Sequence, residues 1–193
     1  MSKNNTKRLR EEFFNRNTLE VAKKLLGKIL CVKAGKEVLK GIVMETEAYR
    51  GEDDLANHAS KGRTKRTETM YLKAGTIYTY LVYGMHFCLN IVTEKENYPS
   101  AVLIRGILPI VEKGKEANVK TKTEQIMIIG PGRVSRYFGV NKSFNGLDIS
   151  GNKIWLEDWG IKVSKKDITI SKRIGVDYAK HCKDYFWRFG VKL

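Results

Sequence analysis

The sequence has 193 residues, a length that one domain accounts for, and it carries 36 Lys and Arg against 21 Asp and Glu. The net charge of +15 favours a polyanion such as nucleic acid as partner, and the 42% hydrophobic content suffices for a core, which excludes a disordered basic tail. The charged start MSKNNTKRLREEFF lacks the apolar stretch of a signal peptide, and no run reaches the ~18 apolar residues of a membrane span. We therefore expect an intracellular, cytoplasmic protein, associated with the nucleoid if the source is bacterial, which is neither secreted nor held in a membrane.

The first predicted element is a short helix after a basic N-terminal segment. Asn17 is a suitable N-cap, Glu20 lies three residues further on, and Gly27 occupies the position just past the helix end. Residues 1–16 are expected to be loosely ordered.

Apolar and alternating runs predict the elements that follow. Strands are expected at residues 28–33, 39–49, 77–82, 87–93 and 101–107, the first two joined by a turn at 34–37. Residues 55–68 read as polar and irregular, 113–124 as a charged loop, and Gly130-Pro131-Gly132 as the start of a helix that ends near Gly139. The pattern indicates the α+β class: one mixed domain over residues 1–193, with a curved antiparallel sheet, surrounding helices and a protruding hairpin.

Two carboxylates mark one predicted strand. With side chains alternating, Glu45, Glu47 and Tyr49 share a face of a mostly apolar segment. A solvated face is the ordinary reading, but a carboxylate at a strand end in a basic protein can also serve as a general base. Arg105, inside the apolar run VLIR, is costly to bury alone and should have a carboxylate or carbonyl partner.

The hairpin at residues 76–90 is rich in aromatic residues. Tyr83 and Met85 flank Gly84 at its tip, where large apolar groups would meet water, as expected of a contact surface. Its register stays open: a two-residue turn at Gly84-Met85 puts Tyr80 and Asn90 on opposite faces. A three-residue loop over 84–86 instead pairs them directly.

Metal and disulfide chemistry have little support in the sequence. The cysteines, Cys31, Cys88 and Cys182, are odd in number and far apart, which excludes a disulfide framework and argues against a zinc finger. His181-Cys182 lacks a third ligand at metal spacing, so we expect both residues to be structural, and Cys88 to pack in the core.

The ordered motifs of the chain resemble the alkyladenine (3-methyladenine, or methylpurine) DNA glycosylase family. The resemblance is carried by METEAYRGEDDLANHA, TMYLKAGTIYTYLVYGMHFCLNIV, AVLIRGILP, IGPGRVSRYFGVNKSFNGLDI, KRIGVDYAKH and WRF. It spans nearly the whole chain from about Thr18. It implies a single mixed domain, no metal or organic cofactor, and double-stranded DNA with damaged purines as the partner of a monomer.

The resemblance also implies a reaction. Such enzymes flip a damaged purine nucleotide out of the duplex and hydrolyse its N-glycosidic bond, leaving an abasic site. Carried over to this sequence, Glu47 is the general base that activates water, and Arg105 helps to hold that water. Alkylated and deaminated purines such as 3-methyladenine and hypoxanthine are the expected substrates, and attack by water implies no strand cleavage.

Further roles follow from the same resemblance. Tyr49, His58 and Tyr80 would line the base pocket, and Asn90 would crowd the exocyclic amino group of guanine and reject it. Because Tyr80 and Asn90 must then face one pocket, the resemblance favours the three-residue loop or a bulge. The wedge that fills the vacated stack would be Tyr83, with Met85 beside it.

Contacts to the DNA backbone are expected from exposed basic side chains. The candidates are Lys61, Arg63, Lys65 and Arg66, followed by Arg133 and Arg136. Residues 64–67 read TKRT, where a T-P-R-N-like run is more usual in the family, and this departure lies within the first group.

Two other functions stay open at this point. A non-catalytic nucleic-acid-binding protein could use the same basic surface and hairpin, although it would gain little from a carboxylate facing phosphates. A sugar hydrolase with Glu45 and Glu47 as its acid and base is disfavoured, because side chains two apart on one strand do not flank a substrate.

Overall fold

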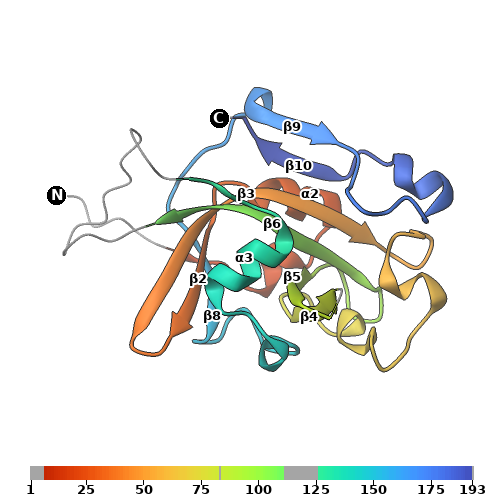
Figure 1. Ribbon diagram of the computed structural model, residues 1–193, viewed down its shortest axis with the longest axis horizontal. Helices are drawn as coiled ribbons and strands as arrows, with labels where there is room; N and C mark the ends of the chain where they lie inside the picture. Colours follow the sequence, from red (N-terminus) through yellow and green to blue (C-terminus); the bar gives the residue numbers. More distant parts are fainter. Residues whose placement is uncertain (1–6, 83, 111–125, 193) are drawn as a thin grey trace.

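The computed structural model describes residues 7–82, 84–110 and 126–192. Its centre is an antiparallel sheet in the order β1-β8-β2-β3-β6-β5-β4, which β10, β9 and β7 extend (Figure 1). Ten strands lie in the described ranges: β1 Lys7–Arg8, β2 Ile29–Ala34, β3 Glu37–Arg50, β4 Ile77–Val82, β5 His86–Val92, β6 Ser100–Ile110, β7 Ile128–Ile129, β8 Ile154–Asp158, β9 Ile168–Ser171 and β10 Arg188–Val191. With three α-helices around an unclosed sheet, the fold is the α+β arrangement that the sequence predicts.

The α-helices lie close to their predicted positions. They are α1 Glu11–Phe14, α2 Thr18–Leu25 and α3 Pro131–Phe138, and short 3₁₀ helices occupy His58–Lys61, Glu68–Tyr71, Lys142–Phe144, Lys165–Asp167 and Lys180–Asp184. The Asn17 side chain accepts a hydrogen bond from the backbone N–H of Leu19, which caps α2, and Gly27 follows the helix end with a φ of 82°. Pro131 opens α3, and Gly139 ends it in the left-handed conformation, as the sequence indicates.

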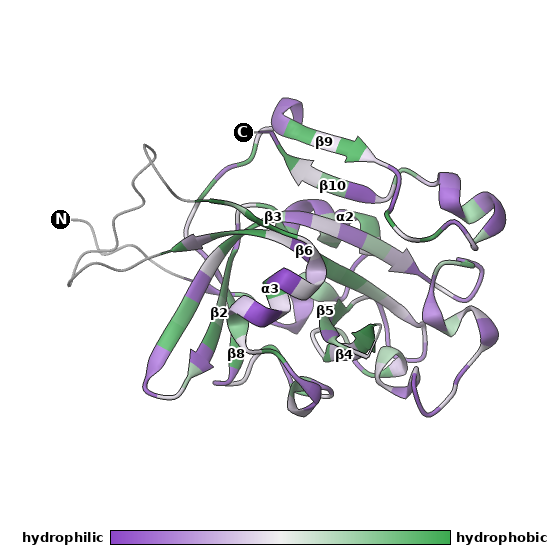
Figure 2. Cartoon of the chain, in the orientation of Figure 1, coloured by the Kyte–Doolittle hydropathy of each residue, from purple (hydrophilic) through white to green (hydrophobic). Residues whose placement is uncertain are grey.

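The hydrophobic core lies against the long central strands. Figure 2 shows mostly apolar residues along β2 and much of β6, with polar residues concentrated in the turns and short helices. The main cluster joins α2 through Val21 and Leu25 to Ile104 of β6 and Phe138 of α3. Residues 41–48 of β3 are buried throughout, because α2 packs against this strand and its alternate side chains enter two clusters: Val43 and Ala48 the main one, Ile42 and Met44 a second one with Trp155.

Strand β3 changes partner along one of its edges. Residues Glu37 to Ile42 pair with β2, whereas Glu45 to Glu47 pair with β10. Strand β6 pairs along the other edge from Lys40 to Arg50. The β3–β6 register is irregular around Glu45 and Gly106, where a Cβ on Gly106 would lie 2.8 Å from that of Glu45. Only glycine tolerates this approach, so Gly106 allows the irregularity that brings Glu45 against Arg105.

The β4–β5 hairpin settles the register that the sequence leaves open. Val82 pairs with His86, which leaves a three-residue connection, and Tyr80 pairs with Cys88 while Asn90 pairs with Tyr78. The three-residue length is confirmed and puts Tyr80 and Asn90 on one face. The expected direct pairing of Tyr80 with Asn90 is wrong, because His86, predicted to lie in the loop, already pairs with Val82 and shifts the register of β5 by two residues.

Two further expectations differ from the structure. Residues 7–16 belong to the fold instead of being loosely ordered: β1 pairs with β8, and Phe14 of α1 is fully buried. The supposedly irregular stretch 55–68 contains the 3₁₀ helix His58–Lys61, which Asn57 caps. The predicted charged loop at 113–124 lies outside the described residues.

Candidate active site

The two carboxylates of β3 and the arginine of β6 meet at the irregular part of the sheet. The Arg105 Nε lies 3.5 Å from Glu47 Oε1 and 3.6 Å from Glu45 Oε1. Arg105 therefore has two carboxylates as ion-pair partners, while its buried Nε makes no hydrogen bond to any described residue. Glu45 also accepts a 2.8 Å hydrogen bond from Arg188 of β10, so two arginines hold its carboxylate.

Glu47 is fully buried, yet both oxygens of its carboxylate are engaged. Its Oε1 accepts a hydrogen bond from the backbone N–H of Ile174 at 2.9 Å, and its Oε2 accepts one from the Tyr49 hydroxyl at 2.8 Å. Burial raises the pKa of Glu47, and the Arg105 charge with these two hydrogen bonds only partly opposes that effect. The result is a dehydrated carboxylate with a higher proton affinity than an ordinary glutamate.

An aromatic pocket lies next to this carboxylate. It encloses about 240 Å³, including the open space at its mouth, and is lined by Tyr49, Ala56, Asn57, His58, Met70, Tyr78, Tyr80, Asn90 and Ala101. The Tyr49 side chain both lines this pocket and donates to Glu47, and so links the two. Aromatic rings and the Asn90 amide form much of its wall, and such a lining suits a flat aromatic group.

The histidine of the pocket is held neutral between tyrosines. His58 Nδ1 lies 3.0 Å from the Tyr78 hydroxyl, and its ring meets the Tyr80 ring edge-on with centroids 4.3 Å apart. Burial, helped by the positive charge of Arg66, lowers the pKa of His58 to about 4. At neutral pH the pocket therefore presents an uncharged imidazole.

Asn90 is fixed at the wall of the pocket by the backbone of its own hairpin. Its Nδ2 donates to the Tyr78 carbonyl at 3.2 Å and to the Cys88 carbonyl at 3.4 Å. The amide of this side chain cannot turn without losing both bonds. Cys88 is buried, as the sequence indicates.

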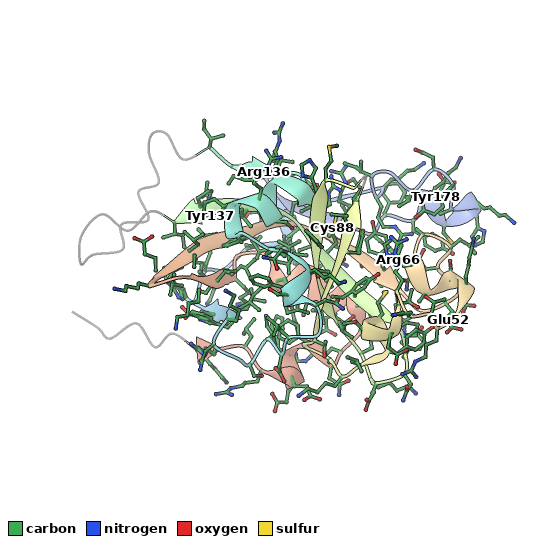
Figure 3. The ribbon with its side chains drawn as sticks, turned by 60° about the horizontal axis from the view of Figure 1, so that its bottom comes forward. Glu52, Arg66, Cys88, Arg136, Tyr137 and Tyr178 are labelled. Carbon is green, nitrogen blue, oxygen red and sulfur yellow. The ribbon has the colours of Figure 1, made fainter. Side chains whose placement is uncertain are left out.

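The predicted DNA-contacting residues fall into three situations. Met85 is 71% exposed at the hairpin tip, and Tyr83 lies outside the described residues. Exposed positions are taken by Lys61, Lys65, Arg133 and Arg136, the last of which Figure 3 shows on α3. The guanidinium of Arg63 is bound within the protein, since it pairs with Glu68 at 2.6 Å and contacts Asn97.

Arg66, predicted to contact the DNA backbone, lies beside the aromatic pocket. Its guanidinium carbon lies 5.7 Å from the centre of the Tyr80 ring. Burial raises the pKa of Tyr78 to about 12, while the Arg66 charge beside it acts in the opposite direction. In Figure 3 Arg66 lies between the loop with Glu52 and the hairpin with Cys88. The TKRT segment thus contributes a cation to the rim of the pocket.

Sequence reasoning missed the group that supports Glu47 and Tyr49 from behind. Arg173 is buried, pairs with Asp54, and lies with its guanidinium carbon 4.8 Å from the centre of the Tyr49 ring. The residue next to it, Ile174, supplies the N–H that binds Glu47. Its segment lies more than 120 residues from Glu47, and the only signal available was that KRIGVDYAKH belongs to the motifs of the resemblance.

Within the described part of the chain, no group of three His, Cys, Asp or Glu side chains is arranged to hold a metal ion. Among those same residues no helix is long and apolar enough to cross a membrane.

Comparison with known proteins identifies the family. The family model described as "Methylpurine-DNA glycosylase (MPG)" matches residues 12–193. A protein of Clostridium novyi is 44% identical and one of Clostridium perfringens strain 13 is 42% identical, each match covering 96% of both chains. A Legionella pneumophila protein is also 42% identical over 96% of this chain and 95% of its own. All three bear the name "Putative 3-methyladenine DNA glycosylase". The chain therefore belongs to the methylpurine-DNA glycosylase family, whose members are DNA glycosylases of DNA repair.

Proposed function

We propose that this protein removes alkylated and deaminated purines, such as 3-methyladenine and hypoxanthine, from duplex DNA by hydrolysis of the N-glycosidic bond. The observation that carries the proposal is the Tyr49 hydroxyl, which joins the wall of an aromatic pocket to the buried Glu47 carboxylate. With the base of a flipped nucleotide in the pocket, the anomeric carbon of its sugar would lie near this carboxylate.

The chemistry of the bond explains what Glu47 would do. Loss of a purine leaves positive charge on the sugar, as in the oxocarbenium-like transition states of glycoside hydrolysis. A buried carboxylate stabilises that charge in a low-dielectric site and takes the proton of the attacking water. The Arg105 charge, 3.5 Å from Glu47, stabilises the deprotonated carboxylate despite its burial. Its guanidinium would also donate a hydrogen bond that orients the water.

The pocket residues would hold the base and select it. Tyr49 and Tyr80 offer ring faces on which an electron-poor alkylpurine stacks well, and His58 stays uncharged beside them. Asn90, fixed by two backbone carbonyls, would exclude the exocyclic amino group of guanine. Flipping costs a few kcal/mol and least for a damaged base, which adds to this selection.

The exposed hairpin tip and the basic side chains would act on the duplex. Met85, together with Tyr83, would fill the space that the flipped nucleotide leaves. Phosphate contacts fit Lys61, Lys65, Arg133 and Arg136 best, because these side chains are exposed and form no ion pair with any described residue. Arg63 is already bound to Glu68, and Arg66 would touch the flipped nucleotide instead of a distant phosphate.

Release of the base tests the proposal directly. The protein is incubated with a labelled duplex that carries one hypoxanthine, and separately with methylated DNA, and free bases are measured by mass spectrometry. We expect hypoxanthine or 3-methyladenine to be released, with the labelled strand intact until alkali cleaves the abasic site. Salt-sensitive DNA binding without release of any base would instead support the non-catalytic reading. Strand cleavage without alkali would contradict attack by water alone.

The pH dependence follows from the state of Glu47. A general base works only when deprotonated, and burial raises the pKa of this carboxyl above the ordinary glutamate value of about 4.3. The single-turnover rate on hypoxanthine should therefore fall as the pH drops, with its midpoint above that value. His58, with a pKa of about 4, protonates below this limb. A rate that is flat down to pH 4 would exclude Glu47 as the base.

A further inference from the structure

The guanidinium of Arg173 occupies a closed site behind the aromatic pocket. Its side chain is fully buried, and its two Nη atoms make four hydrogen bonds. The acceptors are both carboxylate oxygens of Asp54 at 2.5 and 2.8 Å, the Ala48 carbonyl at 2.9 Å and the Cys182 carbonyl at 3.0 Å. One side chain thus ties together β3, the loop after it and the 3₁₀ helix Lys180–Asp184.

Two of these contacts reach the groups assigned to catalysis. Ala48 lies between Glu47 and Tyr49 on β3, so the bond to its carbonyl fixes the strand where both side chains project. The Arg173 guanidinium also lies against the Tyr49 ring at 4.8 Å and the Trp187 ring at 5.0 Å, measured to the ring centres. The Tyr49 ring is therefore supported on the side of Arg173 while it lines the pocket.

The backbone next to Arg173 reaches Glu47 itself. Ile174 donates its N–H to Glu47 Oε1 at 2.9 Å, and it follows Arg173 directly, so its position depends on where Arg173 is anchored. A hydrogen bond to a carboxylate favours the charged form, and its loss would leave Glu47 with Tyr49 and Arg105 alone.

We propose that Arg173, anchored by Asp54, is a positioning residue that sets the hydrogen bonds of Glu47 and the plane of Tyr49. The role rests on the proposed function of Glu47. It goes beyond holding the fold together, because the exposed Lys172–Asp184 pair at 2.7 Å also joins the segment of Arg173 to the 3₁₀ helix Lys180–Asp184, yet touches neither Glu47 nor Tyr49. That neighbouring pair provides a matched control.

The test compares Arg173→Met and Arg173→Lys with Lys172→Met. The first readout, which does not depend on activity, is the titration of the Glu47 carboxyl carbon by ¹³C NMR, assigned with Glu47→Gln. We expect Arg173→Met to move the midpoint to higher pH, because the Ile174 donor is displaced. Arg173→Lys keeps the charge but not the fork of donors and should restore the midpoint only in part. Lys172→Met should match the wild type.

Other charged and titratable groups around Glu47 also influence its pKa and must stay unchanged in the variants. These are Glu45 and Tyr49 on β3, Arg105 on β6, Tyr80 on β4, Cys88 on β5 and Arg188 on β10. None of them is altered in the three variants. Arg173 itself also acts on Glu47 through its charge, so Arg173→Met removes both that charge and the anchor of Ile174, whereas Arg173→Lys keeps the charge and reports on the positioning alone.

The second readout is single-turnover base release at saturating protein. We expect the rate of Arg173→Met to fall on the order of 10-fold or more, with its acid limb moved in the direction of the NMR midpoint and with DNA affinity nearly unchanged. A purely structural role would lower the active fraction and leave rate and midpoint alone. Should Arg173→Met not fold, Arg173→Lys and Asp54→Asn are used in its place.

The outcomes separate the two proposals. A wild-type protein that releases no base refutes the proposed function, and the NMR midpoint still decides whether Arg173 positions Glu47. Folded Arg173 or Asp54 variants with a wild-type midpoint and rate would overturn the positioning role.

Discussion

Replacing Glu47 with Gln should lower the single-turnover rate of base release by about 10²–10⁴-fold, the usual contribution of a general acid or base. The amide keeps the shape of the side chain but cannot take a proton from water. It also removes the anion that would stabilise positive charge on the sugar. The measurement is free base released from a hypoxanthine-containing duplex at saturating protein.

This variant should fold at least as stably as the wild type. The pKa of Glu47 is raised in the folded protein, so the stabilisation it contributes is present below its unfolded pKa and is lost as the pH rises through its folded pKa. A glutamine side chain carries no charge at pH 7, so the variant does not lose this stabilisation. Its amide can accept from Ile174 and donate to the Tyr49 hydroxyl, which can turn to accept.

Binding provides the control for Glu47→Gln. Since the side chain is fully buried, affinity for lesion DNA should stay within a few-fold of the wild type at the same salt concentration. A variant that is folded, binds DNA and releases base at the wild-type rate would remove Glu47 from the mechanism. Another group would then have to activate the water.

The strands and helix ends could be predicted because local pattern decides them. The strand predicted at 77–82 has the bounds of β4, and the cap at Asn17 and the glycine at 139 fix α2 and α3 as expected. Period-two alternation also puts Glu47 and Tyr49 on one face, where they share a hydrogen bond.

Long-range pairing could not be predicted in the same way. Strand β3 exchanges β2 for β10 at the irregular stretch around Glu45, and nothing in the sequence of β3 indicates a partner more than 140 residues away. The site shares this limit: Glu47 and Arg105 could be singled out one by one, whereas the Ile174 donor depends on how the C-terminal segment returns to the sheet. The register of the β4–β5 hairpin is equally hard to predict, because moving the loop by one residue changes which residues of the two strands pair.

The second large effect concerns stability. Asp54→Ala should lower the free energy of unfolding by about 3–5 kcal/mol, because it leaves Arg173 buried without its counter-charge. The Arg173 pair is closed to solvent, since both side chains are at most 1% exposed. Urea unfolding followed by circular dichroism measures the change, and Asp184→Ala, which breaks the exposed neighbouring pair, should give a much smaller one.

The two halves of the pair should not be equivalent. After Arg173→Met, Asp54 keeps hydrogen bonds from the backbone N–H groups of Ala56 and Arg50, and it can also take up a proton. After Asp54→Ala, Arg173 keeps only the carbonyls of Ala48 and Cys182, and a guanidinium cannot lose its charge at any pH that the fold survives. We therefore expect Asp54→Ala to cost more than Arg173→Met.

The double variant completes the cycle. With both groups gone no charge remains buried, so Asp54→Ala/Arg173→Met should lose less stability than the two single variants added together, by about 0.5–3 kcal/mol. Additive losses would show that each side chain acts through its own backbone contacts and not through the pair. In that case hydrogen bonds alone would hold the segments of Asp54 and Arg173 in place, and Asp54→Asn would leave the midpoint of the Glu47 titration unchanged.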